Sequence, residues 1–298
     1  MRKDKSFTII ELLVVIAVIG FLTSIVAVKV NSARDKAKIA KSIQFSQSIY
    51  HALGSEAVGY WDFNEIIGGN TVRDVSGNGN TGTLFPAVNG PALVDSLVFS
   101  GGNLGKALSF DGVNDYISVP SSQSLDSTPG DLISAITIEA WIKPNTVASA
   151  PDFRNIAAKK GNIDWEIYGL LTDEDQTNVY FYIARETAGV FSIDASLKSD
   201  KWQHVVGTYQ GLPLLKGELN IYVDGEKRDG YGLSGYIGPS TKKLFMGGGS
   251  ATEGSSFSAY YFDGLIDEVR IYKQALTIGQ IQKHYAEGLE KHRNLTMK

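Results

Sequence analysis

A long apolar run near the N-terminus, from Phe7 to Val28, constrains this chain more than any other feature of its sequence. Its 22 residues contain one ionisable side chain, Glu11. A helix of this length rises about 33 Å, and the hydrocarbon of a bilayer is about 30 Å thick. The run therefore predicts a membrane-spanning helix, since a cleaved secretory signal has a shorter apolar region of about 7–15 residues. The preceding cations predict a cytoplasmic N-terminus; they are Arg2, Lys3 and Lys5.

Glu11 is the residue that this environment penalises. A carboxylate in hydrocarbon costs at least a few kcal/mol unless it is paired, protonated or able to reach the interface. A cut between Ser6 and Phe7 would place a new α-ammonium on Phe7, four residues before Glu11. A neighbouring copy displaced along the helix axis could bring that ammonium to Glu11. The ion pair would then fix the register between copies while their apolar faces pack.

The segment that runs from Ser6 through Phe7-Thr-Ile-Ile-Glu11 to Gly20 closely resembles the N-terminal motif of type IV pilins and type II secretion pseudopilins. The resemblance implies that a prepilin peptidase cuts after Ser6, that the amine of Phe7 is methylated, and that Glu11 supports subunit assembly. It implies other pilin subunits, the peptidase and an inner-membrane assembly platform as partners. Ser6 departs from the glycine that the family usually has before the cut. The disulfide loop of many pilins is also missing, because the chain has no cysteine.

The composition changes after Val28, where charged residues alternate with apolar ones at helical spacing. No proline occurs before Pro86. We therefore expect a leader over 1–6, a helix over 7–54 that is transmembrane over 7–28 and amphipathic over 29–53, and a separate domain over 55–298. The protein would begin as a single-pass cytoplasmic-membrane protein and end in an extracellular filament. The formal net charge of -4 argues against specific nucleic-acid binding.

The remainder of the chain has the pattern of an all-β domain. Short β-branched and aromatic runs, such as Ile136–Ile142 and Leu219–Val223, are separated by clusters of Gly, Asn, Asp and Ser. Asp224-Gly225 between two such runs is typical of a tight hairpin turn. The fold class predicted for the whole chain is α+β, with the long N-terminal helix followed by an antiparallel β-sandwich.

Several phrases in order resemble the laminin-G-like, concanavalin A-like jelly roll, among them Gly59–Glu65, Gly105–Pro120, Trp202–Tyr209 and Phe262–Tyr272. The resemblance implies a short helix over 276–289 after the last strand. It also implies a structural calcium ion, for which Asp74, Asn78 and Asp267 are the candidate ligands, with a weaker oxygen-rich loop at Asp111, Asn114 and Asp115. The alternative is that Asp74 and Asn78 form Asx-type turns without a metal.

The catalytic signature of glycosidases with this fold is missing. Those enzymes place two carboxylates on one strand as Glu-x-Asp-x-x-Glu, and neither Ile266-Asp-Glu268 nor Asp173-Glu-Asp175 has that spacing. Four histidines are scattered along the chain, and His204 is predicted to be packed rather than catalytic. Three tryptophans, Trp61, Trp141 and Trp202, fall in strand-like phrases and are expected in the core, which leaves Trp165 as the freest one for a ligand.

Together these features predict a non-enzymatic, type IV pilin-like subunit whose filament displays a lectin-like domain for adhesion to a glycan or a surface protein. Two alternatives stay open. One is a pseudopilin of a type II secretion or DNA-uptake system. The weaker one is a surface-tethered glycoside hydrolase.

Overall fold

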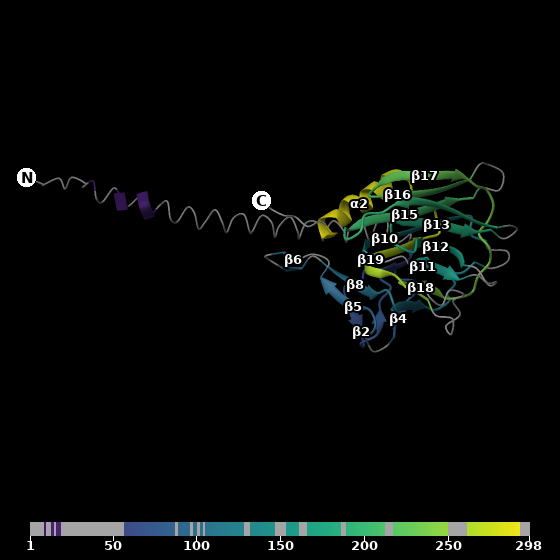
Figure 1. Cartoon of the computed structure of the whole chain (residues 1–298), viewed down its shortest axis with the longest axis horizontal. Helices are drawn as coiled ribbons and strands as arrows, with labels where there is room; N and C mark the ends of the chain where they lie inside the picture. Colours follow the sequence, from purple (N-terminus) through teal and green to yellow (C-terminus); the bar gives the residue numbers. More distant parts are fainter. Residues whose placement is uncertain are drawn as a thin grey trace, which may run out of the picture. The chain divides into compact units, whose positions relative to one another are not determined.

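The chain divides into two units, Met1–Tyr50 and His51–Lys298 (Figure 1). The computed structural model describes residues 9, 13–14, 16–18, 57–86, 89–95, 98–99, 102–103, 105–127, 132–146, 153–160, 166–185, 189–211, 217–249 and 261–292. The six described residues of the first unit are helical, and most of the predicted helix lies outside the described residues. Within the described ranges, no helix combines the length and apolar character needed to cross a membrane.

The second unit is a sandwich of two large antiparallel sheets, so the predicted fold is confirmed. The first sheet has the strand order β17-β16-β15-β10-β19-β8-β5, with β1 paired to β19. Its strands are β1 (Ala57–Trp61), β5 (Ala92–Asp95), β8 (Lys106–Asp111), β10 (Ala135–Pro144), β15 (Gln203–Gln210), β16 (Glu218–Val223), β17 (Glu226–Gly232) and β19 (Asp263–Tyr272).

The second sheet has the order β14-β13-β12-β11-β18-β9-β4-β3-β2. Its strands are β2 (Ile66–Ile67), β3 (Thr71–Val72), β4 (Gly82–Phe85), β9 (Tyr116–Val119), β11 (Arg154–Lys160), β12 (Glu166–Thr172), β13 (Asn178–Ala184), β14 (Val190–Ser196) and β18 (Leu244–Met246). A separate hairpin joins β6 (Val98–Phe99) to β7 (Gly102–Asn103).

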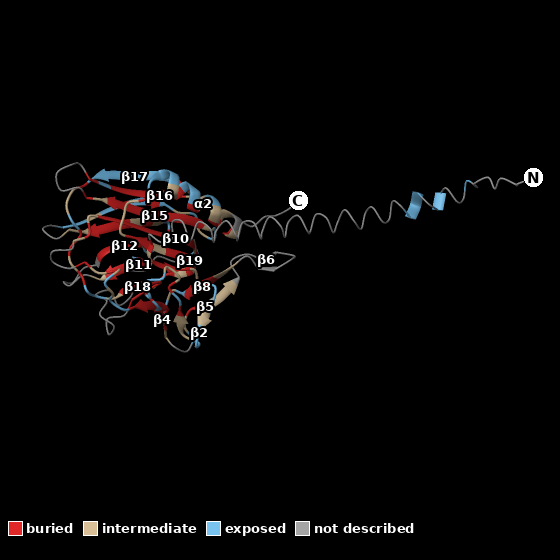
Figure 2. Cartoon of the chain, turned by 180° about the vertical axis from the view of Figure 1, so that it is seen from behind, coloured by how far each residue is buried: buried red, intermediate tan, exposed pale blue. Residues whose placement is uncertain are grey.

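The main core lies between the two sheets. Its largest side chains include Trp61, Phe110, Tyr168 and Phe181, all of them buried. Edge strand β14 alternates between exposed and buried residues, as a half-buried strand should. Central strand β10 is buried along nearly its whole length, and Figure 2 shows the same contrast between the buried middle strands and exposed β17.

Helix α2 (Ile278–His292) explains why β10 is buried on both faces. It covers the outer face of the first sheet, where Leu276 and Ile281 form a second small core with Tyr222 and Tyr272. The helix begins with a capping box, because Thr277 and Gln280 exchange side-chain and backbone hydrogen bonds. It starts two residues later and ends three residues later than the helix predicted over 276–289.

The hairpin predicted at Asp224-Gly225 is present between β16 and β17. Both residues have left-handed backbone angles, with φ of 55° at Asp224 and 74° at Gly225. A two-residue turn of this kind matches the twist of the strands that it joins. The turn and a bulge between Ile221 and Tyr222 together set the register of β17 on β16, and this register positions the groove described below.

Candidate functional site

A layer of buried charged side chains lies between α2 and the outer face of the first sheet. At its centre is Glu139 on β10, which is fully buried. Its carboxylate accepts hydrogen bonds from Arg270 Nη1 at 2.7 Å and Tyr272 OH at 3.3 Å. It also contacts His284 Nδ1 on α2 at 2.9 Å and His204 Nε2 at 3.6 Å. Glu139 therefore connects three strands of the sheet to the helix.

The same layer continues toward the C-terminal end of α2. Glu268 pairs with Arg270 at 3.1 Å and with Lys291 on the helix. Asp267 accepts a hydrogen bond from His292 Nε2 at 2.8 Å, if that nitrogen carries the proton. These residues, with Glu139, His204, Arg270, Tyr272 and His284, are called the buried polar layer below.

The charges in this layer compensate one another. Burial by itself would raise the pKa of Glu139, but His284 and Arg270 outweigh it and hold that pKa well below its usual value. Glu268 follows the same pattern: burial opposes ionisation, and the charges of Lys291 and Arg270 lower its pKa. Burial raises the pKa of Asp267 to about 6, although the hydrogen bond from His292 opposes this shift. Paired, buried carboxylates of this kind fasten a helix to a sheet and offer no access to a substrate.

The two carboxylate clusters considered as catalytic candidates have structural roles. Asp267 and Glu268 belong to the buried polar layer. Asp173 and Asp175 hold the turn between β12 and β13, where they accept hydrogen bonds from the backbone amides of Asn178 and Thr177 at 2.9 and 3.1 Å. His204 is fully buried on β15 with its ring 5.3 Å from Trp141, as predicted for a packed histidine.

The three candidate calcium ligands do not converge on one point. Asp74 is buried, and its two oxygens accept hydrogen bonds from the backbone amides of Tyr60, Ser76 and Asn80 at 2.8–3.0 Å. This is the Asx-type arrangement. The Asn78 side chain donates to the carbonyl of Ala57 at 3.1 Å.

Asp267 lies elsewhere on the sheet. Ala57 is paired with Tyr272, five residues along β19 from Asp267, which is about 16 Å of strand. Asn78 and Asp267 therefore cannot hold the same ion in this structure. In the second oxygen-rich loop, Asp111 accepts from the amides of Val113 and Asn114 at 2.9 and 3.2 Å. No group of three acidic or histidine side chains suited to a metal occurs in the described ranges.

The tryptophans divide between two environments. Trp61 is in the main core and donates to the carbonyl of Asn80 at 2.8 Å. Trp141 is buried beneath α2 rather than between the sheets, and its ring stacks on His292 at 4.3 Å. Trp202 is half-buried against the same histidine, with ring centroids 4.6 Å apart. Trp165 lies outside the described residues, as do the processing and assembly residues Ser6, Phe7 and Glu11.

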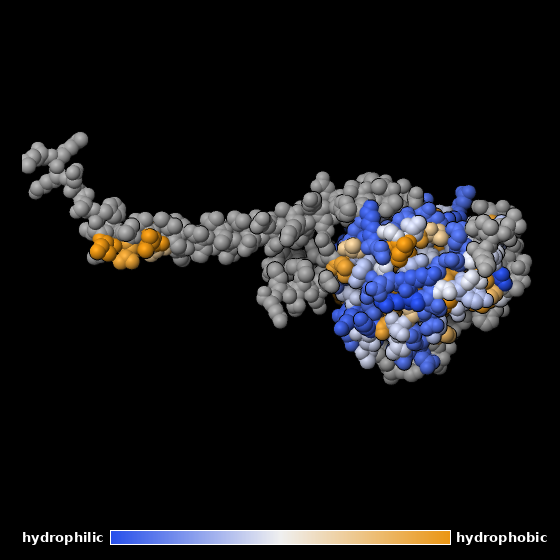
Figure 3. All heavy atoms as spheres, turned by 90° about the horizontal axis from the view of Figure 1, so that it is seen from above, coloured by the Kyte–Doolittle hydropathy of each residue, from blue (hydrophilic) through white to orange (hydrophobic). Residues whose placement is uncertain are grey.

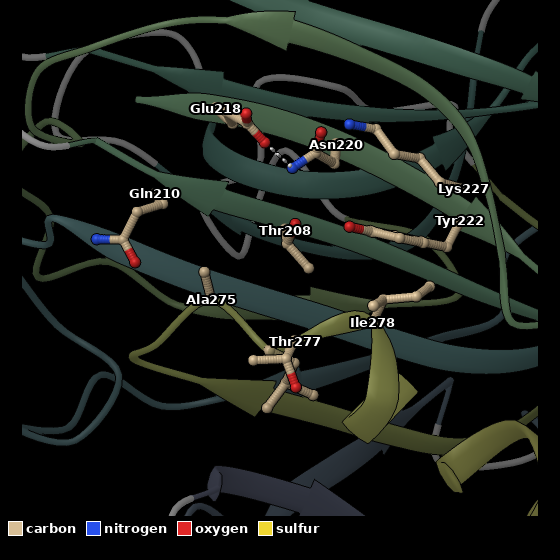
Figure 4. A pocket seen from close by; sticks show the side chains of 10 residues that line it. Thr208, Gln210, Glu218, Asn220, Tyr222, Lys227, Ala275, Thr277 and Ile278 are labelled. Carbon is tan, nitrogen blue, oxygen red and sulfur yellow. Dashed lines mark hydrogen bonds between the residues drawn. The ribbon is translucent and has the colours of Figure 1, made fainter. Parts of the chain in front are cut away.

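An open groove lies on the outer face of the first sheet, beside the start of α2. Its volume is about 530 Å³. Figure 4 shows polar side chains of β15, β16 and β17 on one side of it and residues 275–278 on the other. The lining residues are Thr208, Gln210, Glu218, Asn220, Tyr222, Lys227, Ala275, Leu276, Thr277 and Ile278. Seen from the side of β17 and α2, the described surface is mostly hydrophilic, with small apolar areas (Figure 3).

Sequence reasoning did not find this groove. The alternation of Glu218, Asn220 and Tyr222 along β16 could have placed their side chains on one face of the sheet. It could not have shown that residues 275–278, far away in the sequence, return to form the opposite wall.

The two layers, the antiparallel order and the covering helix define a lectin-like jelly-roll sandwich. Residues 111–282 match the family model of the concanavalin A-like lectin/glucanases superfamily, and residues 1–27 match the prokaryotic N-terminal methylation motif. The first match covers more than half of the chain, and the chain therefore belongs to the concanavalin A-like lectin/glucanases superfamily. Both resemblances noted in the sequence are confirmed.

Solved structures show the same fold at low sequence identity. The binding domain of Paraclostridial Mosquitocidal Protein 1 is 16% identical over 78% of this chain and 52% of that chain, with a TM-score of 0.56. Domain 4 of AbnA, a GH43 extracellular arabinanase from Geobacillus stearothermophilus, in complex with arabinotriose, is 18% identical over 76% and 97%, with a TM-score of 0.54. The binding domain of botulinum neurotoxin DC in complex with SialylT is 13% identical over 78% and 51%, with a TM-score of 0.54.

This chain spans about half the length of the first and third of these structures. At such identities the likeness concerns the fold alone. The search of curated proteins gave no match.

Proposed function

We propose that this chain is a type IV pilin-like subunit whose filament displays a non-catalytic, carbohydrate-binding sandwich domain on the cell surface. The observation that carries the proposal is the presence in one chain of the methylation motif over 1–27 and the superfamily domain over 111–282. A processing motif of this kind serves export and assembly. A lectin-like domain on the same chain would give the assembled subunit a ligand-binding surface.

The assembly step follows from the charge of Glu11. Cleavage after Ser6 by a prepilin peptidase would free the amine of Phe7 for methylation, and a methylated amine keeps its positive charge. A neighbouring subunit can then pair that amine with Glu11 inside the apolar bundle, where an unpaired carboxylate is costly. Subunits would leave the cytoplasmic membrane through an assembly platform and form the core of an extracellular filament.

The binding step is supported by the fold and by the state of the carboxylates. Two of the similar structures carry arabinotriose and SialylT. The strand carboxylates Asp267 and Glu268 are buried and paired, so they do not form an accessible acid–base pair. We therefore propose binding of a glycan without its hydrolysis.

Mass spectrometry of the native N-terminus tests the proposed processing. The expected mature chain begins at N-methylated Phe7, and a chain that still begins at Met1 in the filament fraction would refute processing. Replacing Ser6 with Glu should block the cut and leave an unprocessed, membrane-bound chain.

Filament assembly is tested with a matched pair of variants. Glu11→Ala should remain in the membrane fraction and lower the yield of sheared filaments by at least tenfold. Asp35→Ala removes an equal charge from the amphipathic half of the segment and should assemble like the unmodified chain. Normal filaments from Glu11→Ala would overturn the ion-pair argument. Short filaments confined to the cell envelope would instead identify a pseudopilin.

A further inference from the structure

The groove beside α2 is formed by three hydrogen-bonded strands whose registered residues share one face. Asn220 on β16 lies opposite Thr208 on β15 and opposite Gly230 on β17. In the next row, Glu218 lies between its partners Gln210 and Gly232. In both of these sets of registered residues, the residue on edge strand β17 is a glycine. The β17 side of the groove therefore carries few side chains.

Asn220 presents a buried hydrogen-bond acceptor in this groove. Its side-chain nitrogen donates to Glu218 Oε2 at 3.3 Å. Its Oδ1 atom is buried and has no hydrogen-bond partner among the described residues, and the residue is only 7% exposed. A buried acceptor without a donor is unfavourable. A bound molecule that donates a hydrogen bond to Oδ1 would remove this penalty.

Gly230 leaves room for the side chains of Asn220 and Lys227 to lie against the backbone of β17. A Cβ atom at this position would lie 2.6 Å from Asn220 Oδ1 and 2.7 Å from Lys227 Nζ. Gly230 does not belong to the described glycines with positive φ, so space rather than backbone conformation accounts for glycine here. At Gly232, two residues along the same face, a Cβ would meet nothing within 4 Å.

Lys227 adds a donor next to this acceptor. Figure 4 shows its ammonium close to the Asn220 amide, and both groups lie next to Gly230. Glu218 adds a second acceptor at the rim, while the hydroxyls of Thr208 and Tyr222 can both donate and accept. Ile278, 44% exposed, gives the opposite wall an apolar surface.

We propose that this groove is the saccharide-binding site of the domain, with Asn220 and Lys227 holding adjacent hydroxyls of one sugar unit. A hydroxyl donates to Asn220 Oδ1 and accepts from Lys227 Nζ, which a purely anionic or purely apolar ligand cannot do. The C–H groups of the sugar suit the apolar wall at Ile278. This assignment rests on the proposed function only for the class of ligand.

The test uses the full chain, purified in a zwitterionic detergent that contains no sugar. Binding of arabinotriose, cellotriose, maltotriose, chitotriose and sialyllactose is measured by titration calorimetry. Gly230→Ala and Asn220→Ala should each weaken binding of the best probe by at least tenfold. Gly232→Ala, the matched change on the same strand and face, should bind within twofold of the unmodified chain. Thermal melting of each variant verifies that it is folded.

Protection of Lys227 from acetylation gives a second measurement that needs no variant. The bound probe should slow acetylation of Lys227 but leave that of Lys201 unchanged. Binding that survives both Gly230→Ala and Asn220→Ala would overturn the groove and leave the carbohydrate-binding function standing. If Gly232→Ala weakened probe binding as much as Gly230→Ala, the loss would be a general effect of changing the edge strand. That result would overturn the groove assignment. Failure of the unmodified chain to bind any of the five probes would overturn the groove assignment together with the proposed carbohydrate binding.

Discussion

Removing the charge of Glu139 should loosen α2 and lower the stability of the sandwich. Glu139 is fully buried and connects Arg270 and Tyr272 on β19 to His284 on the helix. The variant Glu139→Gln keeps the shape and two polar atoms of the side chain. In this variant, the carboxylate that still pairs with Arg270 in the buried polar layer is that of Glu268.

The expected size of the effect follows from this arrangement. Breaking a buried ion pair by removing one partner costs about 3–5 kcal/mol. Because Glu268 still compensates Arg270, we expect the lower end, about 3 kcal/mol. For a domain of this size, 1 kcal/mol shifts the Tm by about 2–4 °C, so the Tm of Glu139→Gln should fall by about 6–12 °C.

The assay is thermal unfolding at pH 7, followed by tryptophan fluorescence and circular dichroism. Glu226→Gln is the control, because it removes the same charge from an exposed pair: Glu226 lies 3.1 Å from Arg228 and its side chain is 71% exposed. An exposed pair contributes about 0–1 kcal/mol, so this variant should melt almost like the unmodified chain. Equal melting temperatures for the two variants would refute the reasoning, as would unchanged hydrogen exchange in α2 of Glu139→Gln.

The pH dependence of the same variant provides an independent measurement. The pKa of Glu139 is lowered in the folded state, so its stabilisation is present above its ordinary value near 4.5 and is lost as the pH falls through the folded value. Burial also lowers the pKa of His204, so the unfolded chain takes up that proton first as the pH falls below about 6.5. Asp267 has the opposite effect on stability, because its pKa is raised to about 6 in the folded state. Its contribution to stability increases as the pH falls from about 6 to about 4. Acid should therefore destabilise the unmodified chain, and Glu139→Gln should flatten the part of this curve below pH 4.5.

Three further outcomes are expected. Gly288→Ala should lower the Tm by several degrees, because a Cβ there would lie 2.2 Å from Trp141 Nε1. This is expected although alanine favours helices. At Gly279 in the same helix a Cβ would meet nothing within 4 Å, so Gly279→Ala should keep or raise the Tm. Gly207→Ala should destabilise by about 1–3 kcal/mol, since its Cβ would lie 2.1 Å from the ring of Phe181; urea unfolding measures this. Calcium binding stays a prediction: if an ion is held, chelation lowers the Tm and calcium restores it, whereas an unchanged Tm contradicts a bound structural ion.

Local patterns predicted those parts of the fold that depend on neighbours in the sequence. The turn at Asp224-Gly225 and the strand-like run Leu219–Val223 need only a few consecutive residues. The resemblance to the jelly-roll family, rather than a local pattern, placed the C-terminal helix within three residues at each end. Trp61 was expected in the core and lies there.

Contacts between residues far apart in the sequence could not be predicted from local patterns. Glu139 and His284 are 145 positions apart, and no periodicity states that a helix will cover β10. The burial of Trp141 was predicted, but its place beneath α2 was not, because a strand buried on both faces loses the alternation that assigns side chains to a face. The pairing of Asn220 with Gly230 depends on a bulge after Ile221, which shifts the register that a regular hairpin would have.

The connection of β1 to β19 has a mechanical consequence for a tethered domain. Tension that enters at Ala57 passes from β1 to β19, then to β10, β15 and β16, each joined to the next by an antiparallel ladder. Pulling on anything held at β16 is therefore transmitted across one continuous hydrogen-bonded sheet. The apolar interface between the two sheets lies outside that route.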